Sequence, residues 1–139
     1  MKINSNSQSI VNDSRQLLIK EGDFIEITPI RGRRFRLKLN RTEYQIVCSN
    51  TINQIQVTDC RILLPSGSNG WGIIHLKLNQ QDQVNYYYIK GGEGDLFALN
   101  GVMTSFGIVK KGDLVSDGLN LIRFYKYNDQ GADQDLLEL

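Results

Sequence analysis

The chain has 139 residues, of which 40% are hydrophobic, and this is enough for one globular domain with a stable core. Sixteen basic and fifteen acidic residues leave a net charge of +1, so overall charge favours neither nucleic acid nor an acidic membrane as a partner. No apolar run approaches the ~18 residues of a membrane span, and the first residues lack the hydrophobic region of a signal peptide. We therefore expect a cytoplasmic protein that does not enter a membrane.

Residues 1–18 are mostly polar, and we expect a loosely ordered segment ahead of the domain. After them a period of two dominates, which is typical of β-strands. In residues 34–39 apolar side chains alternate with arginine and lysine, and in residues 71–78 every second residue from Gly72 is apolar or small. Further strands are expected within residues 23–30, 42–49, 52–59, 84–90, 106–118 and 119–127.

Turns rich in Asn, Gly, Asp and Ser separate about nine to eleven such strands at a spacing of roughly 8–12 residues, which indicates an all-β fold, a two-sheet antiparallel β-sandwich. Residues 128–139 contain four acidic residues and no basic one. We expect them to hang from the last strand, either as a solvated tail or as a docking peptide.

The two cysteines, Cys48 and Cys60, have no further Cys or His pair nearby, so they fit neither a disulfide framework nor a zinc site. Two reduced thiols are expected, with no metal and no cofactor.

Several short motifs follow one another along the domain. An acidic-aromatic pair, Glu43-Tyr44, precedes the apolar pair Ile46-Val47, and after a short loop residues 53–57 (NQIQV) begin an alternating segment. Residues 68–74 (SNGWGII) then join a polar loop to the start of a strand.

Two turn motifs complete the series. Asn100-Gly101 tolerates the positive φ that a tight primed turn requires, and residues 112–118 (GDLVSDG) supply a second turn. In order and spacing, the motifs of residues 19–127 resemble those of the forkhead-associated (FHA) domain family. The resemblance implies an FHA/SMAD-like sandwich of about eleven strands over residues 19–127.

FHA domains bind phosphothreonine peptides through loops at one end. An arginine and a serine grip the phosphate, and an asparagine holds the peptide backbone. Carried over to this chain, the resemblance implies that Ser68 is the phosphate-binding serine and that Asn100, preceded by Leu99, is the backbone clamp. Asn69, beside Ser68, could add a side-chain amide to the peptide contact.

The chain departs from the family pattern at three places. Cys48-Ser49 stand where the family has Gly-Arg, so Ser49 takes the position of the phosphate-binding arginine. Trp71 replaces the family's structural histidine, and either its indole supports the loops or its ring is an exposed anchor for a partner. The loop between Val57 and Ser68 is several residues longer than usual.

The missing arginine matters most, because a phosphothreonine dianion is best satisfied by the planar fork of a guanidinium. Its loss should weaken phosphopeptide binding about tenfold or more, since a charged hydrogen bond contributes ~1.5–3 kcal/mol against about 0.5–1.5 for a neutral one. Arg61 or Arg41 could replace it only by reaching the loop end; otherwise each is a solvated surface residue.

An enzyme is not indicated. The glycine-rich residues 91–95 (GGEGD) are not followed by Gly-Lys-Ser/Thr, and the single histidine, His75, has no metal or catalytic partner in a recognisable frame. Residues 31–41 hold six basic residues within eleven, which suits either a nucleic-acid contact or a solvated strand face.

Three functions remain, in decreasing order of preference. The first is a protein-protein interaction module of degenerate FHA type that binds a protein partner without phosphate. The second is a genuine phosphothreonine-peptide-binding domain with a substituted site. The third is nucleic-acid binding through the basic strand 31–41.

Overall fold

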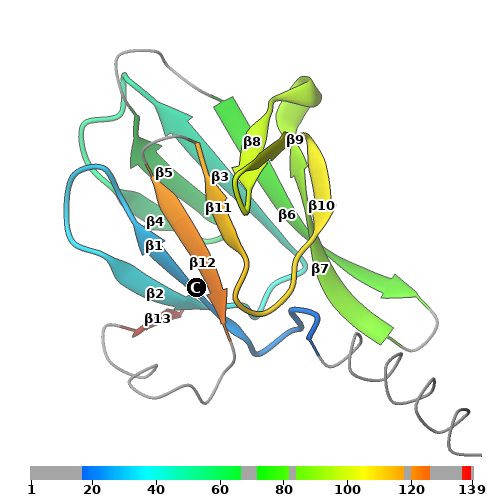
Figure 1. Cartoon of the computed structure of the whole chain (residues 1–139). Helices are drawn as coiled ribbons and strands as arrows, with labels where there is room; N and C mark the ends of the chain where they lie inside the picture. Colours follow the sequence, from blue (N-terminus) through cyan, green and yellow to red (C-terminus); the bar gives the residue numbers. More distant parts are fainter. Residues whose placement is uncertain (1–16, 67–71, 82–83, 118–119, 126–135, 139) are drawn as a thin grey trace, which may run out of the picture.

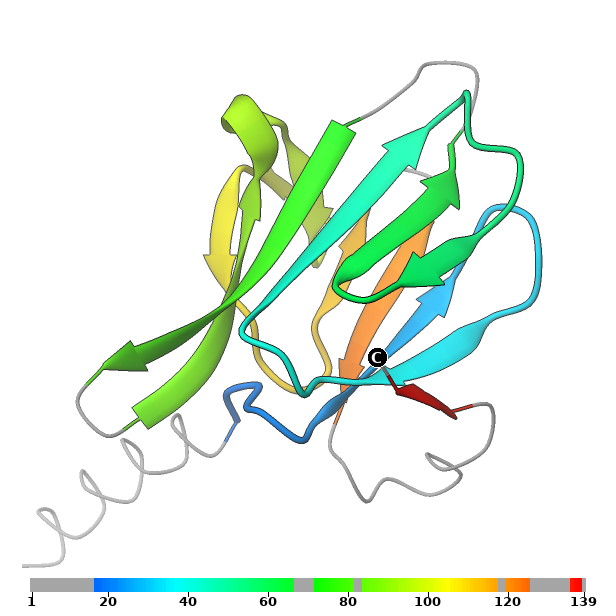
Figure 2. The same cartoon turned by 180° about the vertical axis from the view of Figure 1, so that it is seen from behind.

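The computed structural model describes residues 17–66, 72–81, 84–117, 120–125 and 136–138. Within these ranges the chain forms thirteen β-strands in two sheets, and the one helical element is a short 3₁₀ turn, η1 (Gly92–Gly94). The two sheets pack face to face (Figures 1 and 2). The predicted all-β, two-sheet sandwich is confirmed. The described residues contain no helix with the length and hydropathy that a bilayer span requires.

The seven-stranded sheet has the order β13-β2-β1-β12-β11-β8-β9. Its strands are β1 (Phe24–Thr28), β2 (Phe35–Lys38), β8 (Phe97–Leu99), β9 (Val102–Thr104), β11 (Leu114–Ser116), β12 (Leu121–Tyr125) and β13 (Leu136–Glu138).

The six-stranded sheet has the order β10-β7-β6-β3-β5-β4. Its strands are β3 (Glu43–Ser49), β4 (Gln56–Thr58), β5 (Arg61–Pro65), β6 (Gly72–Gln81), β7 (Val84–Gly91) and β10 (Phe106–Ile108). The strand pairs are antiparallel, as the sequence predicted, except for the parallel pairs β3–β5 and β13–β2.

Strand β5 corrects the interpretation of residues 57–68 as one long loop. Its Ile62 and Leu64 are fully buried, and the strand lies between β3 and β4. The extra length therefore contains a β4–β5 hairpin that closes at Asp59, whose φ is 54°.

Two other expectations also change. Strands β10 and β11 flank the turn around Gly112 as predicted, but they belong to different sheets, so the turn is a crossover between layers. Residues 136–138 do not hang free, because β13 pairs with β2. Most of the segments 1–18 and 128–139 lies outside the described residues, and Ile19 is fully buried.

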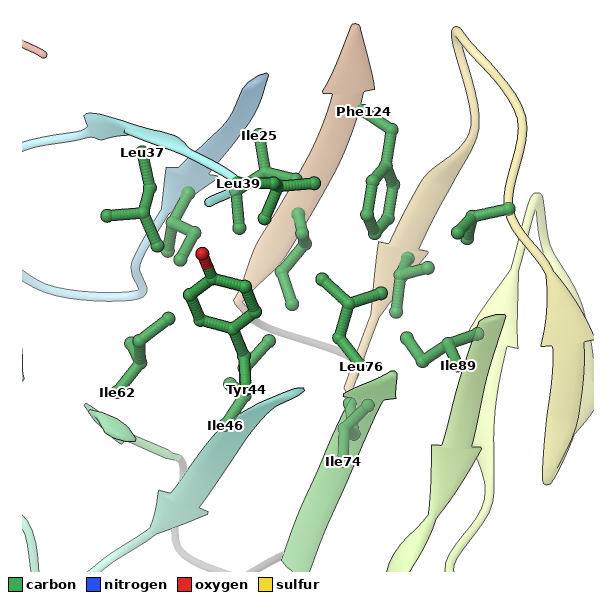
Figure 3. Packing of buried hydrophobic residues seen from close by; sticks show 14 of the residues in the cluster. Ile25, Leu37, Leu39, Tyr44, Ile46, Ile62, Ile74, Leu76, Ile89 and Phe124 are labelled. Carbon is green, nitrogen blue, oxygen red and sulfur yellow. The ribbon is translucent and has the colours of Figure 1, made fainter. Parts of the chain in front are cut away.

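The core forms where the inward faces of the two sheets meet (Figure 3). The alternation in residues 72–78 places Ile74 and Leu76 in this core, as predicted, opposite Ile25 and Phe124 of the other sheet. Burial of these aliphatic and aromatic side chains supplies the main free energy of folding.

Two buried tyrosines fasten the end of the sandwich at which β3 and β5 begin, which we call the basal end. The Tyr44 hydroxyl accepts hydrogen bonds from the backbone N–H groups of Asn40 (2.7 Å) and Arg41 (3.0 Å). The Tyr87 hydroxyl donates to the carbonyl oxygen of Arg41 at 2.6 Å. Residues 40–41 carry the chain from β2 to β3, so these bonds fix the crossover between the two sheets (Figure 3 shows Tyr44 below Leu39).

We predict that Tyr87→Phe lowers the free energy of unfolding by about 1 kcal/mol, because it removes the hydrogen bond to Arg41 and keeps the buried ring. Urea unfolding followed by circular dichroism measures the change. Tyr88→Phe is the matched control, because the Tyr88 ring lies on the outer face, tilted against the ring of Phe106 with the two centroids 5.4 Å apart. This control substitution should change the free energy of unfolding by no more than about 0.5 kcal/mol. Equal effects of the two variants would contradict the role of the Tyr87 hydroxyl.

Candidate functional site

The candidate site lies at the end of the sandwich opposite the basal end, which we call the apical end. Strands β3 and β5 finish there at Ser49 and Pro65, β6 begins there at Gly72, and β7 finishes there at Gly91. The loops β1–β2, β3–β4 and β7–β8 therefore share this end, where β11 also finishes and β12 begins (Figures 1 and 2).

Of the residues that the sequence nominated, Ser49 lies at the apical end. Its Oγ atom lies 2.8 Å from Oγ1 of Thr51 and accepts a hydrogen bond from the Thr51 backbone N–H at 3.2 Å. The hydroxyl is thus already engaged within its own turn. Ser68, Asn69 and Trp71 fall outside the described residues.

Asn100 and Leu99 do not join this group. Strand β8 runs from the apical end toward the basal end. The Asn100-Gly101 turn follows β8, so the whole strand separates this turn from the β7–β8 loop. The Asn100 side chain donates to Asp113 Oδ1 and accepts from the backbone N–H of Leu114, both at 2.9 Å. Asn100 has a φ of 52°, as predicted for a tight primed turn, and the structure places it as a turn residue away from Ser49.

Arg61 is also remote from the apical end, and so is Arg41. Arg61 begins β5 at the basal end, where both arginines line a groove of about 570 Å³ with Cys60 and Asp59. Arg41 there forms an ion pair with Asp59 at 3.2 Å. Arg61 does not reach the apical end, because the length of β5 separates it from Pro65.

Asn120 is the buried polar centre of the apical end. Its side chain is 1% exposed, accepts a hydrogen bond from the Ile30 N–H (2.8 Å) and donates to the Pro65 carbonyl (2.8 Å) and to Asp117 (2.9 Å). Ile30 follows β1 and Pro65 ends β5, so one amide joins the two sheets. The role of Asn120 could not be predicted from the sequence, because an asparagine in a turn does not indicate which distant residues it will hydrogen-bond.

Asp95 holds the β7–β8 loop against the start of β6. Its Oδ2 atom accepts the backbone N–H of Ile73 at 3.2 Å, and a side chain at Gly72 would collide with this carboxylate. Gly72 is therefore required for the close approach of the Asp95 carboxylate. The GGEGD segment, which is not a P-loop, forms this tight loop.

Asp117 places a second carboxylate at the same end. It accepts hydrogen bonds from the backbone and the side chain of Asn120 and faces the thiol of Cys48. Burial, and after it the charge of Asp117, raises the pKa of the Cys48 thiol well above its usual value. Cys48 is thus a free thiol buried in the core.

The basic strand is partly neutralised. Arg36 on β2 lies 3.3 Å from Glu26 on β1, and its guanidinium lies 5.3 Å from the centroid of the Tyr125 ring. Of the bases in residues 31–41, Arg31, Arg33 and Arg34 are exposed in the β1–β2 loop at the apical end, and Arg41 is exposed at the basal end. His75 is half-buried on β6, with its Nδ1 atom 3.5 Å from Glu43.

Apolar side chains are exposed along the flank where β9 and β10 end their sheets. Val102 and Met103 are 67% and 60% exposed, and Phe106 and Ile108 are 53% and 42% exposed. Both strands lie on the same side of the sandwich (Figures 1 and 2), so each sheet ends there in exposed apolar surface.

Comparison with protein-family models, with curated proteins and with solved structures found no match to this chain.

We predict that Asn120→Ala lowers the free energy of unfolding by about 2–4 kcal/mol, because it leaves the Ile30 N–H and the Pro65 carbonyl without their partner in the interior. Denaturant unfolding measures the loss. Asn53→Ala, an exposed asparagine on the β3–β4 loop, is the control and should change stability by less than about 0.5 kcal/mol. A loss below about 1 kcal/mol for Asn120→Ala would show that the amide is not needed to join the sheets.

The two thiols should differ in reactivity. In the native protein at pH 8, Ellman's reagent should modify the partly exposed Cys60 and leave the buried Cys48 unmodified, because only the thiolate reacts and burial disfavours it. Cys60→Ser should abolish the native reaction, whereas Cys48→Ser should preserve it. Rapid native modification of Cys48 would contradict its placement in the core.

Proposed function

We propose that the chain is a non-enzymatic protein-protein interaction module of FHA type that binds its partner without requiring phosphothreonine. The two-sheet sandwich and the order of the turn motifs in the sequence support the proposed FHA type. One observation carries the independence from phosphate: Asp95 and Asp117 place carboxylates at the apical end, beside Gly72 and Cys48. The two free thiols suit a reducing compartment, and we place the module in the cytoplasm.

The charge at this end opposes a phosphate. A phosphothreonine brings a charge of about −1.5 to −2, and each nearby carboxylate repels it by about 1 kcal/mol per charge pair at 4 Å even in water. Ser49, where the family has its arginine, offers a neutral hydroxyl that Thr51 already engages. Phosphate at this position would therefore meet repulsion where the family supplies attraction.

The exposed apolar flank of β9 and β10 also supports a protein partner. Contiguous exposed apolar side chains on a small domain commonly mark interaction surfaces. The alternative of nucleic-acid binding along β2 has less support, because Glu26 neutralises Arg36 and β13 covers the outer edge of the strand.

Titration of a phosphothreonine peptide library and its unphosphorylated twin against the full chain tests the proposal. We expect the two sets to bind with affinities within about threefold, because no phosphate contact distinguishes them. Preference for the phosphorylated set by about tenfold or more would support the second function, a genuine phosphothreonine site.

Ser49→Arg is the informative variant for the same titration. It returns a guanidinium to the position that the resemblance assigns to phosphate binding, and Asp95→Asn removes a repelling charge. If the apical end is a degenerate phosphate site, the double variant should gain phosphopeptide affinity about tenfold. No gain would indicate that the apical loops do not have the FHA arrangement.

A further inference from the structure

We propose that the partner presents an acidic peptide segment to one corner of the apical end, formed by the β1–β2 loop (residues 29–34) and the β3–β4 loop (residues 50–55). We call it the arginine corner. This inference rests on the proposed function and names the chemistry of the partner. Both views show the two loops side by side at the apical end, on the side of β2 and β4 (Figures 1 and 2).

The β1–β2 loop is held in place at its base and in its middle. Pro29 is buried, and the next residue, Ile30, donates its N–H to Asn120 at 2.8 Å. Gly32, with a φ of +102°, lies so close to Ile55 that a Cβ atom there would be 2.8 Å from the Ile55 Cδ1 atom. The loop thus packs on the β3–β4 loop, and its arginines start from fixed positions, which lowers the entropy lost on binding.

The loop carries positive charge that the described part of the chain does not neutralise. Arg31, Arg33 and Arg34 are all exposed. Arg34 lies 3.9 Å from Glu26, which is closer to Arg36 at 3.3 Å, and the described residues include no ion pair to Arg31 or Arg33. These guanidinium groups are available to pair with carboxylates from another molecule.

The neighbouring groove is lined by uncharged residues, with amide and hydroxyl side chains beside the apolar Ile52 and Leu63. It has a volume of about 370 Å³ and its lining residues are Thr51, Ile52, Asn53, Gln54, Gln56 and Leu63. Every residue from 49 to 56 lacks charge. Side-chain amides both donate and accept, so Asn53 and Gln54 suit the N–H and C=O groups of an extended peptide.

Together the two loops fit an extended peptide whose acidic side chains face the arginines and whose main chain lies along the groove. Arginine pairs with a carboxylate through two parallel hydrogen bonds, which gives geometric selectivity as well as attraction. Nucleic acid is less suited, because the described residues that line the groove include no aromatic side chain on which a base could stack.

The test uses the full chain and fluorescence anisotropy. The probe is a fluorescein-labelled peptide of twelve residues in which Glu alternates with Leu and Ser; a twin carries Gln in place of Glu, and a single-stranded DNA has matched charge. We expect the acidic peptide to bind, with an affinity that falls as salt rises, and the Gln twin to bind at least about tenfold more weakly.

Arg31→Glu combined with Arg33→Glu should weaken binding of the acidic peptide about tenfold or more. The matched control is Lys90→Glu with Lys110→Glu, which makes an equal change of charge at exposed positions near the opposite edge of the six-stranded sheet. This control should change the affinity for the acidic peptide by no more than about twofold. Unchanged thermal unfolding of both variants verifies folding. Asn53→Leu with Gln54→Leu removes two of the three side-chain amides that line the groove and should weaken binding about threefold.

Equal binding of the acidic peptide and its Gln twin would overturn the inference, and so would equal loss in the arginine and lysine variants. Tighter binding of the DNA that depends on Arg31 and Arg33 would assign the corner to nucleic acid instead. Neither peptide probe carries phosphate, so the comparison of the two peptides does not report on a phosphothreonine site: the arginine corner can fail while phosphate independence holds, and the reverse.

Discussion

The hydrogen bonds of Asn120 join the two sheets at the end where the candidate sites lie. A buried primary amide must satisfy both its oxygen and its nitrogen, since an unpaired polar group in the interior is costly. Here the amide oxygen accepts a hydrogen bond from the Ile30 N–H, and the amide nitrogen donates to the Pro65 carbonyl and to the Asp117 carboxylate. The amide thereby fixes the start of the β1–β2 loop and the end of β5. Hydrophobic burial holds the layers together but has no direction, so this directional bond determines how the apical loops are aligned.

At the basal end, Tyr44 and Tyr87 do the same work around residues 40–41. Each ring packs in the core, and each hydroxyl satisfies backbone groups of the crossover between the sheets. Buried polar contacts thus fasten the sandwich at both ends, with an aliphatic core between them. We expect the backbone of such a sandwich to move little on binding, because the ends of the loops are already held by these contacts.

Local periodicity predicts the strands that alternate, because an alternating segment such as residues 72–78 indicates its own buried face. It fails for β5, where Leu63, Leu64 and Pro65 follow one another and the segment reads as a loop. It also fails for the pairing of strands: the turn at Gly112 is visible in the sequence, but nothing local shows that it connects two different sheets. Long-range register decides these features, and β3 pairs with β5 and β6 only in the folded chain.

The same limit explains the candidate site. Arg61 lies seven residues before Ser68 in the sequence, which makes it a candidate for the same site. Strand β5, however, spans about 13 Å from the basal to the apical end, so Arg61 lies at the basal end. Topology instead gathers Asp95 and Asp117 on the side of β7 and β11, and Arg31 and Arg33 on the side of β2. The apical end is therefore electrically divided, and an acidic peptide lying across it is attracted on one side and repelled on the other. Such a division selects the direction in which the peptide lies as well as its composition, which a uniformly basic surface would not do.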